Sequence, residues 1–284
     1  MKIKLLILSL LFLPAFANAA DIVSHGTLGS GLEMYWAFEE GDGAVRVDAT
    51  TTGQLTDNNT VVQTTGKIGN AASTSRVAGS YFSNPDNAST SFTGSLSMNV
   101  WLKPGAVPAT SESEGLIGKG NGDRAYYYAY GFSNCAGSNF ELYVALDPDG
   151  SGPTPGQHCH ALGTSPISSA SWTMITIVYD TGVDDTEYFV DGTSVETDTG
   201  VPASIFDGTS ALLVGGNAVF NTHVFDGGMD EMGLWSRPLS GTEVTALWNS
   251  GDGLAFEEAA APATPDPEVF IIFSLIAPLR PFFV

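Results

Sequence analysis

The chain has 284 residues, 31 of them Asp or Glu and only 10 Lys or Arg, so its formal net charge is −21. The 43% hydrophobic and 11% aromatic content excludes a disordered chain. The acidic excess argues against nucleic acid as a partner, because nucleic-acid-binding surfaces need clustered Lys and Arg.

The N-terminus has the three parts of a secretory signal peptide. Lys2 and Lys4 form the charged region, residues 5–16 form the apolar stretch, and Ala17–Asn18–Ala19 is a small-residue cleavage site. We therefore expect residues 1–20 to be removed and the mature chain to be secreted, either free or on the cell surface. Removal takes away two lysines and no acid, which changes the net charge from −21 to −23.

The body of the chain is predicted to be all-β. Apolar and polar residues alternate in segments 32–38, 96–103, 140–146 and 172–178, as in half-buried strands. Segment 125–132 (AYYYAYGF) is aromatic on both faces, which is typical of a strand between two layers. Because βαβ patterns are absent from the sequence, we expect an antiparallel two-sheet jelly-roll sandwich.

One short helix is predicted near the end of this body. Ser240 and Glu243 have the spacing of a capping box, and Val244, Leu247 and Trp248 then share one helical face. We expect this helix to cover one end of the sandwich. The five tryptophans lie in apolar runs and are expected in the core rather than in ligand platforms; they are Trp36, Trp101, Trp172, Trp235 and Trp248.

The two cysteines, Cys135 and Cys159, predict one disulfide, because disulfides persist in exported chains. Closing that loop would stabilise the fold by about 3 kcal/mol. The alternative is a metal site built on His158, Cys159 and His160, but no second His or Cys cluster in the sequence completes four ligands.

Five short motifs follow one another along the chain: LEMYWAFEEGDG at 32–43, GKIGNA at 66–71, SLSMNVWLKP at 95–104, YFVDG at 188–192 and FDGGMDEMGLWSRPL at 225–239. Their order and spacing resemble the laminin G-like, concanavalin A-type jelly-roll domain of bacterial secreted proteins. The resemblance covers about residues 30–253. It supports a domain over 21–257, between the signal peptide and a tail at 258–284.

The resemblance also implies one structural Ca²⁺. Carried over by position, the ligands would be Asp230 first, then Glu39 or Asp48, with Gly79 as a carbonyl donor. The alternative is that Asp230 accepts a backbone N–H in a turn and binds no metal. An EF-hand at 147–158 is excluded, because its twelfth position holds His158 instead of Glu.

Sugar-binding modules use aromatic rings together with amide and carboxylate groups. Tyr126 and Tyr128 lie on one predicted strand, and Asn121, Asp123 and Arg124 lie in the loop before it. We take these five residues as candidate ligand contacts. The alternative for the tyrosines is core packing.

Catalytic motifs are missing from the sequence. Laminarinase-type relatives carry Glu-x-Asp-x-Glu or Glu-x-Asp-x-x-Glu, which this chain lacks, and Asp230 and Glu231 would point to opposite faces of an extended strand. We therefore expect a non-catalytic module that recognises a polysaccharide or a cell-surface glycan or protein. The alternatives are a surface-anchored adhesive or structural protein, and an enzyme of the same fold with an unfamiliar site.

The tail has a Pro/Ala linker at 259–267 and an apolar stretch at 269–279, followed by Arg280. The stretch is shorter than the roughly 20 residues that a spanning helix needs. It loosely resembles a bacterial C-terminal sorting signal, which would attach the chain to a membrane or direct its sorting. The alternatives are a disordered apolar tail and an imperfect gene end.

Overall fold

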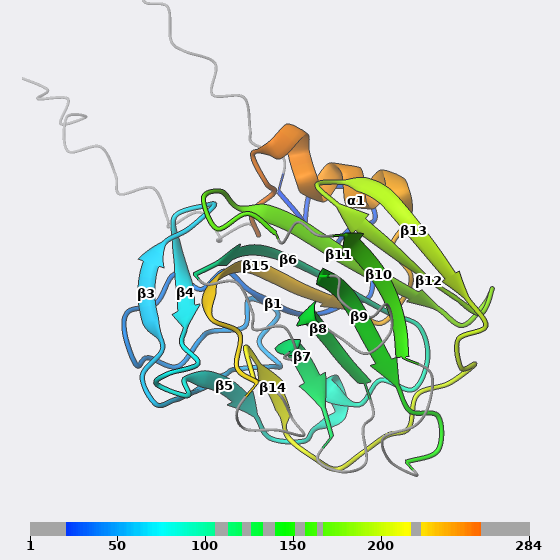
Figure 1. Ribbon diagram of the computed structural model, residues 1–284, viewed down its shortest axis with the longest axis horizontal. Helices are drawn as coiled ribbons and strands as arrows, with labels where there is room; N and C mark the ends of the chain where they lie inside the picture. Colours follow the sequence, from blue (N-terminus) through cyan, green and yellow to red (C-terminus); the bar gives the residue numbers. More distant parts are fainter. Residues whose placement is uncertain are drawn as a thin grey trace, which may run out of the picture.

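The protein is a sandwich of two antiparallel β-sheets, seen in a computed structural model that describes residues 21–105, 113–120, 126–132, 140–150, 157–163, 167–216 and 223–256 (Figure 1). The predicted signal peptide and the whole of the predicted tail lie outside these residues. This architecture confirms the expected jelly-roll class.

The first sheet has eight strands in the order β13-β12-β11-β6-β15-β4-β3, and β1 pairs additionally with β15. Its members are β1 (Leu32–Trp36), β3 (Val62–Thr65), β4 (Asn70–Thr74), β6 (Leu96–Pro104), β11 (Thr173–Asp180), β12 (Asp185–Val190), β13 (Thr193–Thr199) and β15 (Gly227–Trp235).

The second sheet has seven strands in the order β10-β9-β8-β7-β14-β5-β2. Its members are β2 (Thr56–Asn58), β5 (Tyr81–Asn84), β7 (Ser113–Lys119), β8 (Tyr126–Phe132), β9 (Phe140–Leu146), β10 (Gln157–Gly163) and β14 (Leu212–Val214). The alternating segments of the sequence therefore became β1, β6, β9 and β11, and the aromatic segment became β8.

The main core lies between the two sheets. Alternate residues of the strands point into it, because successive side chains of a strand face opposite sides. It contains Trp36, Val100, Ile177 and Leu234 from the eight-stranded sheet, and Phe82, Tyr128, Leu142 and Val214 from the seven-stranded sheet.

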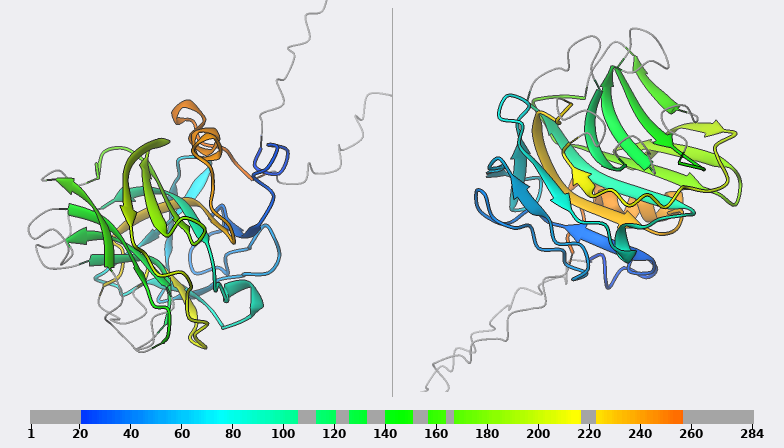
Figure 2. Two further views of the ribbon diagram at one scale, coloured as in Figure 1. Left: turned by 90° about the vertical axis from the view of Figure 1, so that its right-hand side faces the viewer. Right: turned by 90° about the horizontal axis from the view of Figure 1, so that it is seen from below.

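A second apolar layer covers the outer face of the eight-stranded sheet. Tyr35, Trp101, Phe189 and Trp235 point out from that face and pack against the helix α1 (Gly241–Trp248) and the N-terminal segment 21–31. Figure 2 shows the helix and the N-terminal segment beside each other on this side. The helix therefore covers a sheet face rather than only an end of the sandwich.

The capping box predicted for α1 is present. The Glu243 amide donates to Ser240 Oγ (3.3 Å), and the Ser240 amide donates to Glu243 Oε2 (2.9 Å). The helix ends at Asn249, whose φ of 47° is left-handed, and a 3₁₀ turn follows at Asn249–Gly251. A second 3₁₀ turn lies at Ala88–Thr90. Among the described residues, no helix is long and apolar enough to cross a membrane.

The hairpin between β12 and β13 turns on two residues with positive φ, Asp191 (48°) and Gly192 (74°), as a tight antiparallel turn requires. A Cβ atom at Gly192 would lie only 2.8 Å from Trp248 Cβ. Glycine is therefore needed here for both conformation and space.

Trp36, Trp101 and Trp235 are buried as predicted, and Trp172 and Trp248 pack against the outer layer while partly exposed.

Strand β7 carries a buried charge near each end. Lys119 is 1% exposed, and its ammonium donates to Asp86 Oδ1 (2.5 Å) and Ser91 Oγ (3.0 Å). At the other end, the fully buried Glu114 is paired with the Arg76 guanidinium. Buried charges need such partners because an unpaired charge in the interior is strongly unfavourable.

Replacing Phe82 with Ala is expected to lower the free energy of unfolding by about 3–5 kcal/mol, because it leaves a cavity in the core. Lys119→Met is expected to cost less than about 2 kcal/mol, because the side chains of Asp86 and Asp207 are 35% and 53% exposed and stay solvated. Chemical denaturation measures both. If the two variants lose the same free energy of unfolding, the prediction that apolar packing at Phe82 stabilises the fold more than the charge of Lys119 is wrong.

Candidate functional site

The residue predicted as the first calcium ligand lies in a β-bulge of β15. The register moves from Asp230 opposite Trp101 to Gly233 opposite Asn99, and Glu231 between them has a φ of 50°. A left-handed conformation is uncommon for a residue other than glycine. The strand is therefore not extended here, and the expectation that Asp230 and Glu231 face opposite sides is wrong.

Both carboxyl groups are instead buried on the side of the sheet that faces α1. Asp230 Oδ2 accepts hydrogen bonds from the backbone N–H groups of Lys67 (2.7 Å) and Ile68 (3.0 Å). The Tyr35 hydroxyl, which belongs to the apolar layer under α1, donates to Glu231 Oε2. Asp230 is 0% and Glu231 2% exposed.

The loop at 66–70, the GKIGN part of the resemblance motif, wraps two carboxylates. Besides the bonds to Asp230, it holds Glu39, which accepts from the Asn70 amide and from Asn70 Nδ2, both at 3.0 Å. A Cβ at Gly66 would lie 2.6 Å from Asp230 Oδ2, and a Cβ at Gly69 would overlap Glu39. Gly66 is therefore required by close packing, since the nearest neighbour of a Cβ there would be the Asn70 carbonyl oxygen, and Gly69 is favoured by its positive φ of 55°.

Burial dominates the electrostatics of this group. Desolvation raises the pKa of Asp230 to about 7, against three backbone N–H groups that lower it. Desolvation, together with the charge of Asp230, raises the pKa of Glu231 to about 8. Asp230 and Glu231 therefore hold protons near neutral pH, but their burial closes both carboxyl groups to a substrate, whereas Glu39 is exposed.

The predicted calcium ligands divide between separate networks. Asp48 accepts four backbone N–H groups, from Tyr35, Thr50, Thr52 and Gly53. The Gly79 carbonyl accepts from Asn59 Nδ2 (2.9 Å). In the part of the chain that the structure describes, no three His, Cys, Asp or Glu side chains are grouped as metal ligands. Only Asp230 and Glu39 share one loop, so calcium at these two residues stays a prediction.

The two tyrosines predicted as ligand contacts lie in the core between the sheets. Tyr126 and Tyr128 are both 0% exposed, and their hydroxyls donate to the carbonyls of Thr90 (3.2 Å) and Leu96 (3.3 Å). Neither ring is available for stacking on a sugar. The reason is strand parity: residues 126 and 128 face inward on β8.

Several predictions lie outside the residues that the structure describes. These are the loop contacts Asn121, Asp123 and Arg124 and the disulfide partner Cys135. Cys159 is placed by its backbone on β10, opposite Tyr143 of β9. The disulfide stays a prediction.

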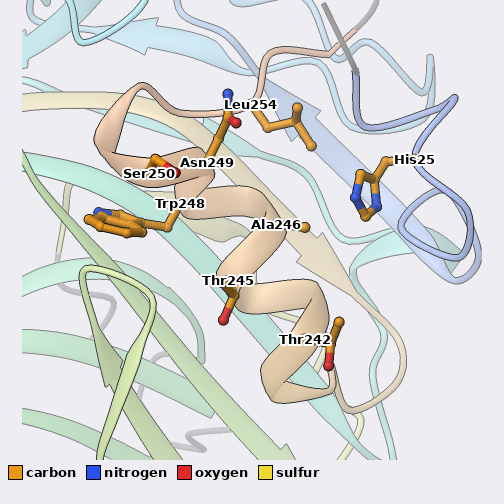
Figure 3. A pocket seen from close by; sticks show the side chains of 8 residues that line it. All are labelled: His25, Thr242, Thr245, Ala246, Trp248, Asn249, Ser250 and Leu254. Carbon is orange, nitrogen blue, oxygen red and sulfur yellow. The ribbon is translucent and has the colours of Figure 1, made fainter.

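A hollow of about 370 Å³ opens between α1 and the N-terminal segment (Figure 3). His25 and Leu254 lie on the side of α1 that carries Thr242 and Ala246, and Asn249 marks the end of the helix. His25 and Thr242 could not be predicted from the sequence as lining residues, because a single histidine before β1 and a threonine in a helix give no recognisable pattern.

Comparison with known proteins assigns the family. Residues 74–245, more than half of the chain, match the family model of the concanavalin A-like lectin/glucanases superfamily. The chain therefore belongs to this superfamily, as the motifs predicted. A search of curated proteins finds no match.

Solved structures share the fold. Domain 4 of AbnA, a GH43 extracellular arabinanase from Geobacillus stearothermophilus in complex with arabinotriose, matches with a TM-score of 0.58 at 20% identity, over 76% of this chain and 97% of that one. The binding domain of Paraclostridial Mosquitocidal Protein 1 matches with a TM-score of 0.59 at 16% identity, over 78% of this chain and 52% of that one. Trypanosoma rangeli sialidase in complex with sialic acid matches with a TM-score of 0.54 at 14% identity, over 80% of this chain and 34% of that one.

The carboxyl cluster makes stability depend on pH. Because the pKa values of Asp230 and Glu231 are about 7 and 8 in the folded protein and about 4 unfolded, the folded state keeps protons that the unfolded state releases. As the pH rises, Asp230 between about pH 4 and 7 and Glu231 between about pH 4 and 8 are each expected to lower the free energy of unfolding by up to about 1.4 kcal/mol per pH unit.

Thermal melts from pH 5 to 9 measure this effect. Glu231→Gln is expected to flatten the fall in melting temperature, because the amide is neutral at every pH. Asp252→Asn, at an exposed carboxyl, is the matched control and should keep the slope of the unmodified chain. If the melting temperature of Glu231→Gln falls with pH as steeply as that of the unmodified chain, the Glu231 carboxyl does not stay protonated in the folded protein near neutral pH.

Calcium at Asp230 and Glu39 has its own test. Adding Ca²⁺ after EDTA is expected to raise the melting temperature of the unmodified chain and not of Asp230→Asn. The rise should be larger at pH 8 than at pH 6, since Asp230 must be ionised to bind a cation. An unchanged midpoint at both pH values would rule out the calcium site.

Proposed function

We propose that this chain is a secreted recognition module that binds glycans without cleaving them. The fold is lectin-like, and the observation that carries the proposal is its match to 97% of an arabinanase domain in complex with arabinotriose. A module of the same extent as a complete sugar-bound domain is a reasonable size for a stand-alone binder.

The charge of the chain supports a neutral glycan as ligand. With 31 acids against 10 basic residues, the protein repels acidic polysaccharides over most of its surface. Several of its cations are engaged: Lys119 and Arg46 are buried, Arg76 is paired with Glu114, and Arg237 with Glu243. An anionic ligand would need free cations, so neutral polysaccharides or neutral cell-surface glycans fit better.

The sequence supports binding over cleavage. A retaining glycosidase needs two carboxyl groups about 5 Å apart that reach the substrate. The chain lacks the Glu-x-Asp-x-Glu strand motif. Its adjacent acids on β15, Asp230 and Glu231, are buried on the outer side of the eight-stranded sheet and occupied by backbone and tyrosine donors.

The predicted signal peptide and tail support a location outside the cell. The N- and C-terminal segments of the described domain lie together, since the Ile22 amide donates to the Ala255 carbonyl (3.0 Å). A tail that serves as an anchor or sorting signal would therefore leave from the α1 side. The seven-stranded sheet would then point away from the attachment.

A glycan array with the mature chain, 21–284, tests the function. We expect binding to neutral glycans, with arabinotriose among the first ligands to examine, and no release of reducing sugar from the same polysaccharides. Binding to no glycan on the array would contradict the proposal, and release of reducing sugar would replace it with the enzyme alternative.

A further inference from the structure

The hollow beside α1 is formed by the helix with the turn that follows it and by the N-terminal segment, and Thr245, Trp248 and Ser250 line it from the side of α1 away from His25 (Figure 3). Thr242, Ala246 and Asn249 follow one another along the other face of the helix, and His25 and Leu254 lie across from it (Figure 3). The small side chain of Ala246 in the middle of the face leaves the space open. The volume of about 370 Å³ is within the 300–1,000 Å³ range of ligand pockets.

One residue that lines this hollow carries a buried polar atom without a partner. His25 Nδ1 is shielded from solvent and makes no hydrogen bond. Buried polar atoms of native proteins are almost always hydrogen-bonded, so an exception needs an explanation. Because water does not reach Nδ1 in this ring orientation, a ligand hydroxyl in the hollow would bond it after the imidazole turns about its Cβ–Cγ bond.

Further polar groups stand at the rim. Asn249 donates through Nδ2 to the Gly253 carbonyl (2.8 Å), which orients its amide and leaves Oδ1 as an acceptor. The Thr242 side chain is exposed and makes no hydrogen bond within the described part of the chain. A hydroxyl, an amide oxygen and an imidazole nitrogen therefore surround an apolar floor of Ala246 and Leu254.

The hollow is held open by a fixed backbone. Asn249 and Ser250 have positive φ values of 47° and 58° in succession, a strained arrangement for residues other than glycine. The N-terminal wall is fastened as well, because Arg237 donates to the Thr27 carbonyl (2.8 Å) and Trp235 to the Leu28 carbonyl (2.7 Å). A preformed hollow loses little conformational entropy on binding.

From these features we infer that the hollow beside α1 binds a neutral sugar residue of the glycan. A sugar ring has apolar C–H faces for Ala246 and Leu254 and hydroxyls for His25, Thr242 and Asn249. None of the residues that line the hollow is Lys or Arg, so an anionic ligand has no counter-charge there. This inference rests on the proposed function and locates its site.

Titration calorimetry with arabinotriose, cellotriose and laminaritriose tests the site in the mature chain. Thr242→Trp fills the hollow from an exposed position and is expected to weaken binding of the best trisaccharide at least tenfold. Val183→Trp, on an exposed turn residue between β11 and β12 that does not line the hollow, is the matched control and should bind as the unmodified chain does.

A second measurement does not depend on any variant. The imidazole ¹⁵N resonances of His25 are expected to move on titration of the unmodified chain with the same trisaccharide. Unchanged affinity in Thr242→Trp together with unmoved His25 resonances would overturn the site while glycan binding itself stands. A chain that binds no glycan on the array would overturn both.

Discussion

The structure depends on β15. This strand lies near the end of the domain and joins segments that are far apart in the sequence. All nine of its residues are buried, and it pairs with β1, β4 and β6. Its residues also serve both apolar layers, with Met229 and Leu234 between the sheets and Trp235 under α1. Because these pairings are long-range, neither layer is complete until the C-terminal part of the domain has been added.

The same strand carries the bulge that gathers the buried acids. Asp230 and Glu231 lie under the outer layer because one irregular residue turns both carboxyls to one side. Asp230 then accepts hydrogen bonds from the backbone N–H groups of Lys67 and Ile68, and Glu231 accepts one from the Tyr35 hydroxyl. Burial raises the pKa of each acid, and the bonds of Asp230 to Lys67 and Ile68 tie β15 to the loop at 66–70.

The proposed glycan site, by contrast, lies outside the two sheets. The tyrosines of β8 complete the core, whereas the helix and the N-terminal segment leave a hollow with an unpartnered imidazole nitrogen. Binding residues are often carried by loops and terminal segments on a rigid scaffold, since these segments tolerate change better than packed strands.

The sequence by itself determined the fold class, the family, most strands, the α1 capping box and the Asp191–Gly192 turn. These depend on local periodicity and short-range geometry, which neighbouring residues encode. Only the tertiary structure decided that Tyr126 and Tyr128 face inward, that Asp48 and Gly79 belong to networks other than that of Asp230, and that His25 meets α1. Which strand face is buried and which segments meet across more than 200 residues depend on long-range pairing, for which no local pattern exists.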